Sequence, residues 1–270
     1  MFWFFLFLFM LCGAIIGSFT NCFVWRLYKD ESLMGRSYCP KCRNKIHWYD
    51  NIPVISFLLL KAKCRHCKEG ISWQYPIVEI STSLLFGAAF MMAAKNIFLS
   101  GSFDSLIWAL NDPYFVLRLA RDFFIIFIFT VVFIYDFRWY LVSDKAVLPA
   151  TLLLVLINIF LGLFWWKILL AALIGAVFFL LQFILSKGKW IGGGDIRLGL
   201  LIGAAFGRLD FLALTLMLAY FIGSVVGITL ISFKKKGWKS EVPLGVFLAI
   251  ASLITLFFGD NIINWYLGLL

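Results

Sequence analysis

The sequence predicts an all-α polytopic membrane protein with about eight transmembrane helices and a small zinc-ribbon-like cytoplasmic insertion between the first two helices. Hydrophobic residues make up 63% of the 270-residue chain and charged residues only 14%. A soluble domain has roughly 45–50% apolar and about 25% charged residues. One water-soluble core cannot bury the larger apolar fraction, so lipid must surround much of this chain. The insertion is predicted by two cysteine pairs within a polar stretch.

Eight apolar segments are the expected membrane spans. The first covers residues 2–25, and it is read as retained because it lacks the basic start and small-residue cleavage site of a signal peptide. The sixth is short for a hydrocarbon core of about 30 Å, so we expect it to be tilted, broken or sheltered by neighbouring helices. The domains expected are the first helix (1–25), the insertion (26–75) and a transmembrane domain (76–270). The later spans are residues 76–94, 123–140, 147–166, 168–186, 196–206, 211–233 and 242–258.

The distribution of lysine and arginine predicts the orientation in the membrane. With eight spans, 19 of the 24 basic residues fall on one side, in segments 26–75, 138–145, 187–197 and 234–239. The positive-inside rule places that side in the cytoplasm and both termini outside. The net charge of +10 is therefore assigned to cytoplasmic loops, and no nucleic-acid partner is expected.

Two C-x-x-C pairs in the insertion predict a zinc site. Cys39 and Cys42 form one pair, and Cys64 and Cys67 form the other, with 21 residues between the pairs. Each pair can offer two thiolates to one tetrahedral Zn²⁺, and a closed four-sulfur site of this kind is structural. Disulfides are the alternative, but the cytosol disfavours them. A redox role is a further alternative, although a redox C-x-x-C normally occurs singly beside a βαβ pattern.

Four other residues of ligand type lie outside these pairs. His47 and His66 are in the same insertion and are spare possible ligands. Exposed, unliganded histidines are the simpler interpretation of both. Cys12 and Cys22 lie in the first span with an offset that does not place them on one helix face, so both are interpreted as small hydrophobic residues.

Acidic residues at membrane depth mark a candidate catalytic site. Such residues are costly in lipid and are therefore functional candidates by default. Asp136 lies near the cytoplasmic end of the third span, and Asp195 ends a glycine run between the fifth and sixth spans. Glycines have no Cβ, so a backbone or a substrate can approach the carboxylate closely. The glycine run consists of Gly192, Gly193 and Gly194.

Two carboxylates in one site predict aspartyl-protease chemistry. They cannot both ionise easily, so they share a proton; one then acts as a base toward water and the other as an acid toward the scissile peptide. The alternative is that Asp195 only caps a helix. Asp144 is a rival for Asp136, but its position after Ser143 is typical of a helix start. Glu79, just inside the second span, is a possible accessory residue, and a packing role fits it equally well.

In order along the chain, these motifs resemble the type IV prepilin peptidases, membrane aspartyl proteases with a G-x-G-D motif. The resemblance covers nearly the whole chain and assigns the two catalytic aspartates to Asp136 and Asp195. Two small departures are Arg197, where the family often has lysine, and residues 142–144, Val-Ser-Asp in place of Ile-Pro-Asp. The matching segments are residues 17–21, the cysteine pairs, 48–56, 75–79, Asp136, 192–195 and 242–245.

The resemblance implies a function that composition alone cannot give. Family members cut the basic leader from prepilins and pseudopilins, after a glycine, at the cytoplasmic face of the bacterial inner membrane. Those with the cysteine-rich loop are expected also to N-methylate the new amino terminus with S-adenosylmethionine. Such enzymes serve type IV pili, type II secretion or competence. No G-x-G-x-x-G-type loop for the methyl donor is present, so no residues are assigned to it.

Two other functional classes fit parts of the sequence. A proton-coupled transporter would also place acids at membrane depth, but the paired halves that transporters often show are not visible here. A zinc-organised scaffold of a secretion machine would need no acids at all. Both classes predict that Asp136 and Asp195 are dispensable for prepilin cleavage.

Overall fold

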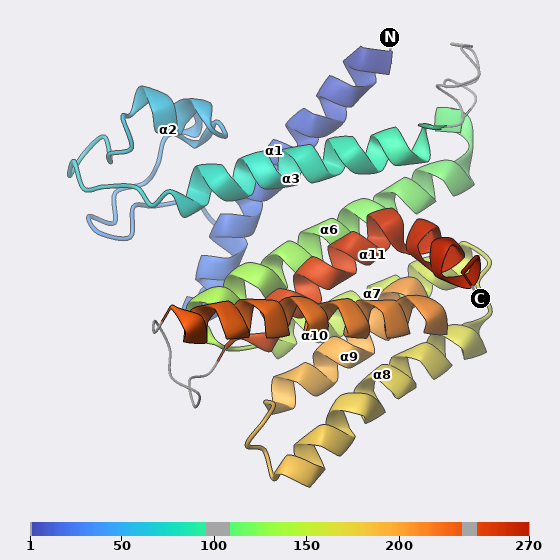
Figure 1. Ribbon diagram of the computed structural model, residues 1–270. Coiled ribbons are helices and arrows are strands. Elements are labelled where there is room, and N and C mark those ends of the chain that lie inside the picture. The colour runs from blue at the N-terminus through green and yellow to red at the C-terminus, as the bar shows by residue number, and fades with distance from the viewer. Residues whose placement is uncertain (1, 96–108, 234–241, 270) are drawn as a thin grey trace. The chain divides into compact units, whose positions relative to one another are not determined.

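The computed structural model describes residues 2–95, 109–233 and 242–269, and this part of the chain is helical with no strand (Figure 1). Packing divides the chain into two units, Met1–Phe127 and Ile128–Leu270. Helix α6 (Pro113–Trp139) begins in the first unit and ends in the second. The prediction of an all-helical chain with a small insertion is confirmed.

The first unit is built on helices α1 (Phe2–Lys29) and α3 (Gln74–Ala93), which cross at close range (Figure 1). Two glycines of α1 permit this approach. A Cβ at Gly13 would lie 2.7 Å from the Thr82 carbonyl oxygen, and one at Gly17 would lie 2.8 Å from the Cα of Glu79. Small residues four apart are typical of tightly packed membrane helices.

The insertion occupies the chain between these two helices. It contains a 3₁₀ turn η1 (Trp48–Asn51) and a short helix α2 (Ile55–Leu59), which the sequence did not predict. Two isolated antiparallel bridges, Tyr38 to Lys45 and Lys63 to Gly70, close the two cysteine turns. The rest of the insertion is irregular, so it depends on side-chain contacts for its shape.

The second unit surrounds a short buried helix. Helix α9 (Gly193–Phe206) packs on α8 so closely that a Cβ at Gly199 would lie 2.2 Å from the Gly175 carbonyl oxygen. Gly203 meets Ala171 of α8 in the same way, at 2.3 Å. The short sixth span is therefore sheltered by its neighbours, one of the three arrangements expected. The neighbouring helices are α7 (Asp144–Phe160), α8 (Trp165–Ser186), α10 (Leu209–Ser232) and α11 (Leu244–Leu267).

Polar contacts fix the far end of α9. The fully buried Asn158 of α7 donates to the carbonyl oxygens of Ala204 and Ala205, at 2.8 and 3.0 Å. These bonds satisfy carbonyl groups that a helix end otherwise leaves unpaired.

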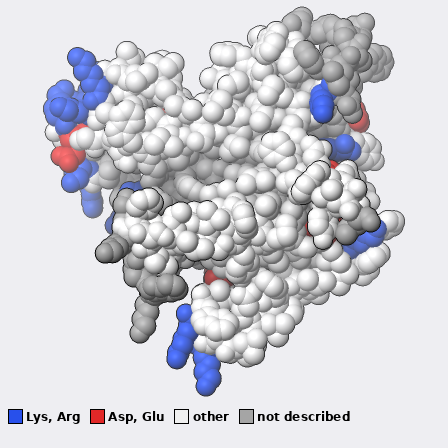
Figure 2. All heavy atoms as spheres, viewed as in Figure 1, with Lys and Arg blue, Asp and Glu red and all other residues white. Residues whose placement is uncertain are grey.

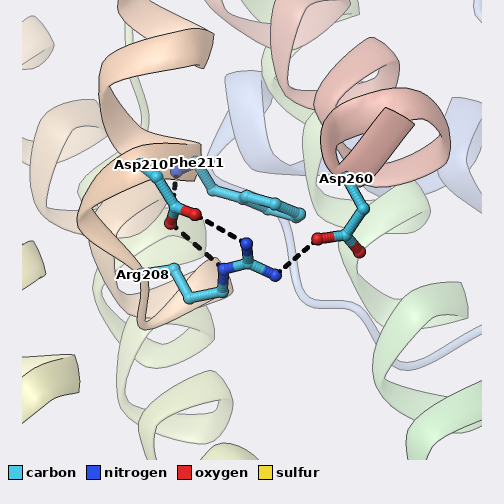
Figure 3. A network of polar contacts seen from close by, with 4 residues as sticks. All are labelled: Arg208, Asp210, Phe211 and Asp260. Atoms are coloured by element: carbon cyan, nitrogen blue, oxygen red, sulfur yellow. Dashed lines mark hydrogen bonds and ion pairs between the residues drawn. The ribbon is translucent and has the colours of Figure 1, made fainter. Parts of the chain in front are cut away.

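Beyond that end, Arg208 joins the start of α10 to α11 (Figure 3). Its guanidinium bonds Asp210 at 2.6 Å and Asp260 at 2.7 Å, and it lies 3.9 Å from the centre of the Phe211 ring. The cluster fixes the end of α9 and the turn into α10.

Five described helices are long and apolar enough to cross a membrane: α1, α3, α8, α10 and α11. Each of the eight expected spans contains a helix, although the third begins at Pro113 and not near residue 123, and the fourth ends at Phe160 and not at residue 166. Lysine and arginine gather over the insertion and near the C-terminal end of α8, while most of the viewed surface is uncharged (Figure 2). Segment 234–239, which contributed to the orientation argument, lies outside the described residues. The chain is a multi-pass membrane protein, and the count of eight spans remains a prediction.

Candidate functional site

Asp195 lies in the first turn of α9, directly after the glycine run. Its carboxylate accepts a hydrogen bond from the Gly192 N–H at 3.0 Å, and only 9% of the residue is exposed. The three glycines differ in their surroundings. A Cβ at Gly193 would meet nothing within 4 Å, whereas one at Gly194 would lie 2.8 Å from the Val142 side chain. Packing against Val142 therefore requires a residue without a side chain at position 194. The space beside Gly193 is open.

Asp136 lies near the end of α6, in the part that belongs to the second unit, and is 6% exposed. Its carboxylate oxygen accepts a hydrogen bond from the Val246 N–H at 3.1 Å. A Cβ at Gly245 would lie 2.7 Å from the same oxygen, so a larger residue there would displace the carboxylate. Both contacts come from the first turn of α11.

The structure brings Asp136 and Asp195 into one site. A Cβ at Gly245 would lie 2.7 Å from the Asp136 carboxylate and 3.1 Å from the side chain of Leu198, which follows Asp195 by one turn of α9, so α9 and Asp136 meet at the first turn of α11. Asp136 accepts the N–H of Val246 in the first turn of α11, and Asp195 accepts that of Gly192 at the N-cap of α9; at both helix starts the helix dipole interacts favourably with negative charge. Two neighbouring carboxylates held in this way can share one proton and act as an acid–base pair.

Asp144 has a different partner. It lies in the first turn of α7, with Ser143 at the N-cap, so the helix start predicted at this position is confirmed. Its half-exposed carboxylate forms an ion pair with Arg197 of α9. This pair gives Asp144 a structural role in joining α7 to α9.

Glu79 lies in the first unit, whereas both aspartates belong to the second. The residue is 6% exposed, and its carboxylate accepts the Val54 N–H at 2.7 Å. Val54 has a φ of +61°, a conformation that is strained for a β-branched residue. Glu79 therefore ties the insertion to α3.

The four predicted zinc ligands lie together. The sulfur atoms of Cys39, Cys42, Cys64 and Cys67 are all within 4.8 Å of one another, and those of Cys39 and Cys67 are 3.9 Å apart. Tetrahedral Zn²⁺ with Zn–S bonds of about 2.3 Å holds its sulfurs about 3.8 Å apart. The cluster could therefore hold zinc, and all six cysteines are free of disulfides.

The two cysteine turns repeat the same backbone pattern. The Cys39 N–H donates to the Asn44 carbonyl at 3.0 Å, and the Cys64 N–H donates to that of Glu69 at 2.8 Å. Backbone N–H groups of Cys67 and His66 that point at the Cys64 sulfur help to lower the pKa of this thiol to about 7. Cys64 therefore ionises near neutral pH, whereas burial and the neighbouring thiols raise the pKa of Cys67 to about 11.

The remaining ligand-type residues are outside this cluster. The His47 ring stacks on Tyr49 at 5.2 Å between ring centres, and neither His47 nor His66 belongs to the sulfur group. Cys22 lies 4.0 Å from the Ser37 hydroxyl, and Cys12 is exposed on α1. The structure thus gives none of these four a ligand position.

Comparison with known proteins adds the family. Residues 11–93 match the bacterial peptidase A24 N-terminal domain, and residues 123–229 match the type IV leader peptidase family. A prepilin leader peptidase/N-methyltransferase of Pseudomonas aeruginosa is 31% identical over 96% of this chain and 92% of the relative. The chain belongs to this family. Two further relatives have the same name. The one in Aeromonas hydrophila is 31% identical over 98% of this chain and 94% of the relative. The one in Bacillus subtilis is 30% identical over 94% of this chain and 95% of the relative.

Family membership makes the chain a membrane enzyme of the peptidase/N-methyltransferase type. No solved structure matches it. Three contact residues were missed by the sequence reasoning: Gly245 and Val246 beside Asp136, and Val54 beside Glu79. Gly245 and Val54 lie in segments 242–245 and 48–56, whose match to the family was the available signal in the sequence, and Val246 directly follows the first of these segments.

Proposed function

We propose that this enzyme cleaves the basic leader from prepilins and pseudopilins, after a glycine, at the cytoplasmic face of the inner membrane, and then N-methylates the new amino terminus. The observation that carries the proposal is the meeting of Asp136 and Asp195 at two helix N-termini, in one buried site of a chain of this family. The full-length similarity to relatives named for both activities supports the second step.

The chemical step uses the two carboxylates. The ionised aspartate takes a proton from a water molecule, which attacks the scissile carbonyl carbon, while the protonated aspartate donates its proton to the carbonyl oxygen. When the tetrahedral intermediate breaks down, the first aspartate passes the proton from water to the leaving nitrogen, and the second takes a proton back from the diol, which restores the pair. Gly192 and Gly193 permit the substrate backbone to come close, because the space beside Gly193 is open and Gly192 has no neighbour closer than 3.9 Å to the position of a Cβ. Gly194 permits the close packing against Val142.

The other parts of the proposal concern the insertion and the methyl donor. Zinc bound by Cys39, Cys42, Cys64 and Cys67 stabilises the insertion and takes no part in hydrolysis. S-adenosylmethionine supplies the methyl group. The orientation with both termini outside supports cleavage at the cytoplasmic boundary, since basic residues such as Lys187, Lys189 and Arg197 lie near Asp195 in sequence.

A gel-shift cleavage assay on a co-expressed prepilin tests the peptidase proposal. Asp136→Asn and Asp195→Asn should each abolish conversion to the mature form, because Asn cannot transfer the proton. Asp144→Asn should cleave nearly as wild type and serves as the matched control. Normal processing by either active-site variant would support the transporter or scaffold alternatives instead.

Mass spectrometry of the mature pilin tests the methylation proposal. One added methyl group on the amino terminus is expected when wild-type enzyme is present. A cleaved but unmodified terminus, in cells with ample methyl donor, would restrict this enzyme to proteolysis.

A further inference from the structure

An apolar groove runs along the second unit between α8 and α10. It has a volume of about 540 Å³ and is lined by Ile174 and Phe178 of α8 and by residues 209–220 of α10. Ile174 and Met217 are 42% and 62% exposed, so the groove opens to the surroundings of the helices. Apart from the Tyr220 hydroxyl, the side chains that line it are apolar.

The groove ends at the level of Asp195. Asp195 precedes the last residue of α9 by eleven positions, and Tyr220 follows the first residue of α10 by eleven. At 1.5 Å per residue, both lie about 17 Å along their helices from the intervening two-residue turn. The packing of α8 on α9 agrees, because Gly175 meets Gly199 and the antiparallel register then places Gln182, whose side chain bonds Tyr220, at the level of the glycine run before Asp195.

Polarity changes along the groove. At its Asp195 end, the Tyr220 hydroxyl donates to the Gln182 side-chain oxygen of α8 at 2.8 Å. Toward the turn between α9 and α10, the walls are the apolar side chains of Leu209, Leu212 and Ala213. An occupant that fits must be polar where it meets Asp195 and apolar along the rest of its length.

We infer that this groove holds the apolar helical stem of the prepilin, with the scissile peptide at the Tyr220 end. The inference rests on the proposed function. A substrate that is cut at the membrane boundary keeps its apolar stem in lipid during the reaction. A groove that holds this stem must therefore open sideways to lipid, and one of its ends must lie at the level of the carboxylates. The groove between α8 and α10 has both properties. The peptide bond lies beside Asp195, and the stem extends toward the turn between α9 and α10.

Filling the groove provides the first test. Ile174→Trp narrows it, and Leu173→Trp is the matched control, because Leu173 is the adjacent residue of α8, is similarly exposed (49%) and does not line the groove. We expect Ile174→Trp to slow prepilin cleavage by about tenfold or more, as expected when a substrate is held out of position. Leu173→Trp should stay near wild type. Equal rates in the two variants would overturn the inference.

Photo-crosslinking provides a second test that does not depend on the tryptophan variant folding. A benzoylphenylalanine at Met217, in protein carrying Asp195→Asn to prevent turnover, should form an adduct with the stem of co-expressed prepilin, and the same probe at Leu173 should not. Adducts with lipid alone at Met217 would show that an acyl chain fills the groove, and would overturn the inference. Failure of the proposed function would look different, because wild-type enzyme would then leave the prepilin uncleaved.

Discussion

At the scale of single residues, the candidate site depends on backbone groups as much as on carboxylates. Asp136 and Asp195 are oriented by the N–H groups of Val246 and Gly192, and within the part of the chain that the structure describes no basic side chain forms an ion pair with either. A basic side chain would form an ion pair with the carboxylate and keep it ionised. Backbone N–H groups instead fix the direction of the carboxylate and still allow it to gain or lose a proton. This arrangement suits an acid–base pair.

Gly245 provides a residue-scale prediction. Gly245→Ala should lower cleavage by about 100-fold, because its Cβ would lie 2.7 Å from the Asp136 carboxylate and displace it. Gly227→Ala is the control, since a Cβ there meets nothing within 4 Å. Initial rates of prepilin cleavage by the two purified variants are the measurement. Near wild-type activity in Gly245→Ala would show that the contact does not position Asp136.

At the scale of elements, buried polar groups hold the irregular insertion to the helices. The guanidinium of Arg26, at the end of α1, is buried and donates to four carbonyl groups of the chain that follows, which satisfies a charge that burial would otherwise make costly. Glu79 accepts the Val54 N–H from the other side of the insertion. The four carbonyl groups belong to Ser32, Leu33, Gly35 and Arg36.

Glu79 provides the element-scale prediction. Glu79→Ala leaves the Val54 N–H unpaired and should destabilise the packing of the insertion by about 1–3 kcal/mol. Glu79→Gln keeps an acceptor oxygen and should behave nearly as wild type. Hydrogen exchange of the amides in residues 50–60 measures the difference.

The outcome also decides between the two interpretations of Glu79. If Glu79→Gln keeps slow exchange but loses cleavage or methylation, Glu79 takes part in the chemistry. If Glu79→Ala exchanges as slowly as wild type, the contact with Val54 does not hold the insertion.

The sequence predicted those features that depend on local pattern. The helical spans follow from apolar runs, and the sulfur cluster follows from the two C-x-x-C pairs, since each turn is short and repetitive. It could not predict that Val246 bonds Asp136, because the two are 110 residues apart in sequence and meet only through packing. The ion pair of Asp144 with Arg197 was missed for the same reason. The early start of α6 at Pro113 was missed because charged residues interrupt the apolar pattern there.

At the scale of the whole molecule, the two units carry different tasks. The match at residues 11–93 falls within the first unit, with the sulfur cluster and Glu79, while Asp136, Asp195 and the groove all belong to the second. In the proposed mechanism, hydrolysis therefore uses chemical groups of the second unit alone. Zinc at the cysteine cluster would stabilise the insertion of the first unit.

Chelation provides the molecule-scale prediction. Brief treatment with a zinc chelator should release about one zinc per chain and speed hydrogen exchange in the insertion, because the four thiolates lose the ion that joins the two turns. Cleavage should persist at first, since no metal takes part in hydrolysis. Elemental analysis and initial cleavage rates measure the two effects. Prompt loss of cleavage before the insertion loosens would indicate a metal-dependent peptidase.

A double-mutant cycle tests the central claim, that Asp136 and Asp195 act as one catalytic unit. Cleavage rates of wild type, Asp136→Asn, Asp195→Asn and the double variant are compared on one purified prepilin in detergent or lipid. Groups that act as a unit are strongly non-additive, so each single variant should lose about as much rate as the double variant. A single variant that keeps substantial activity, or single losses that multiply to give the double loss, would contradict the account.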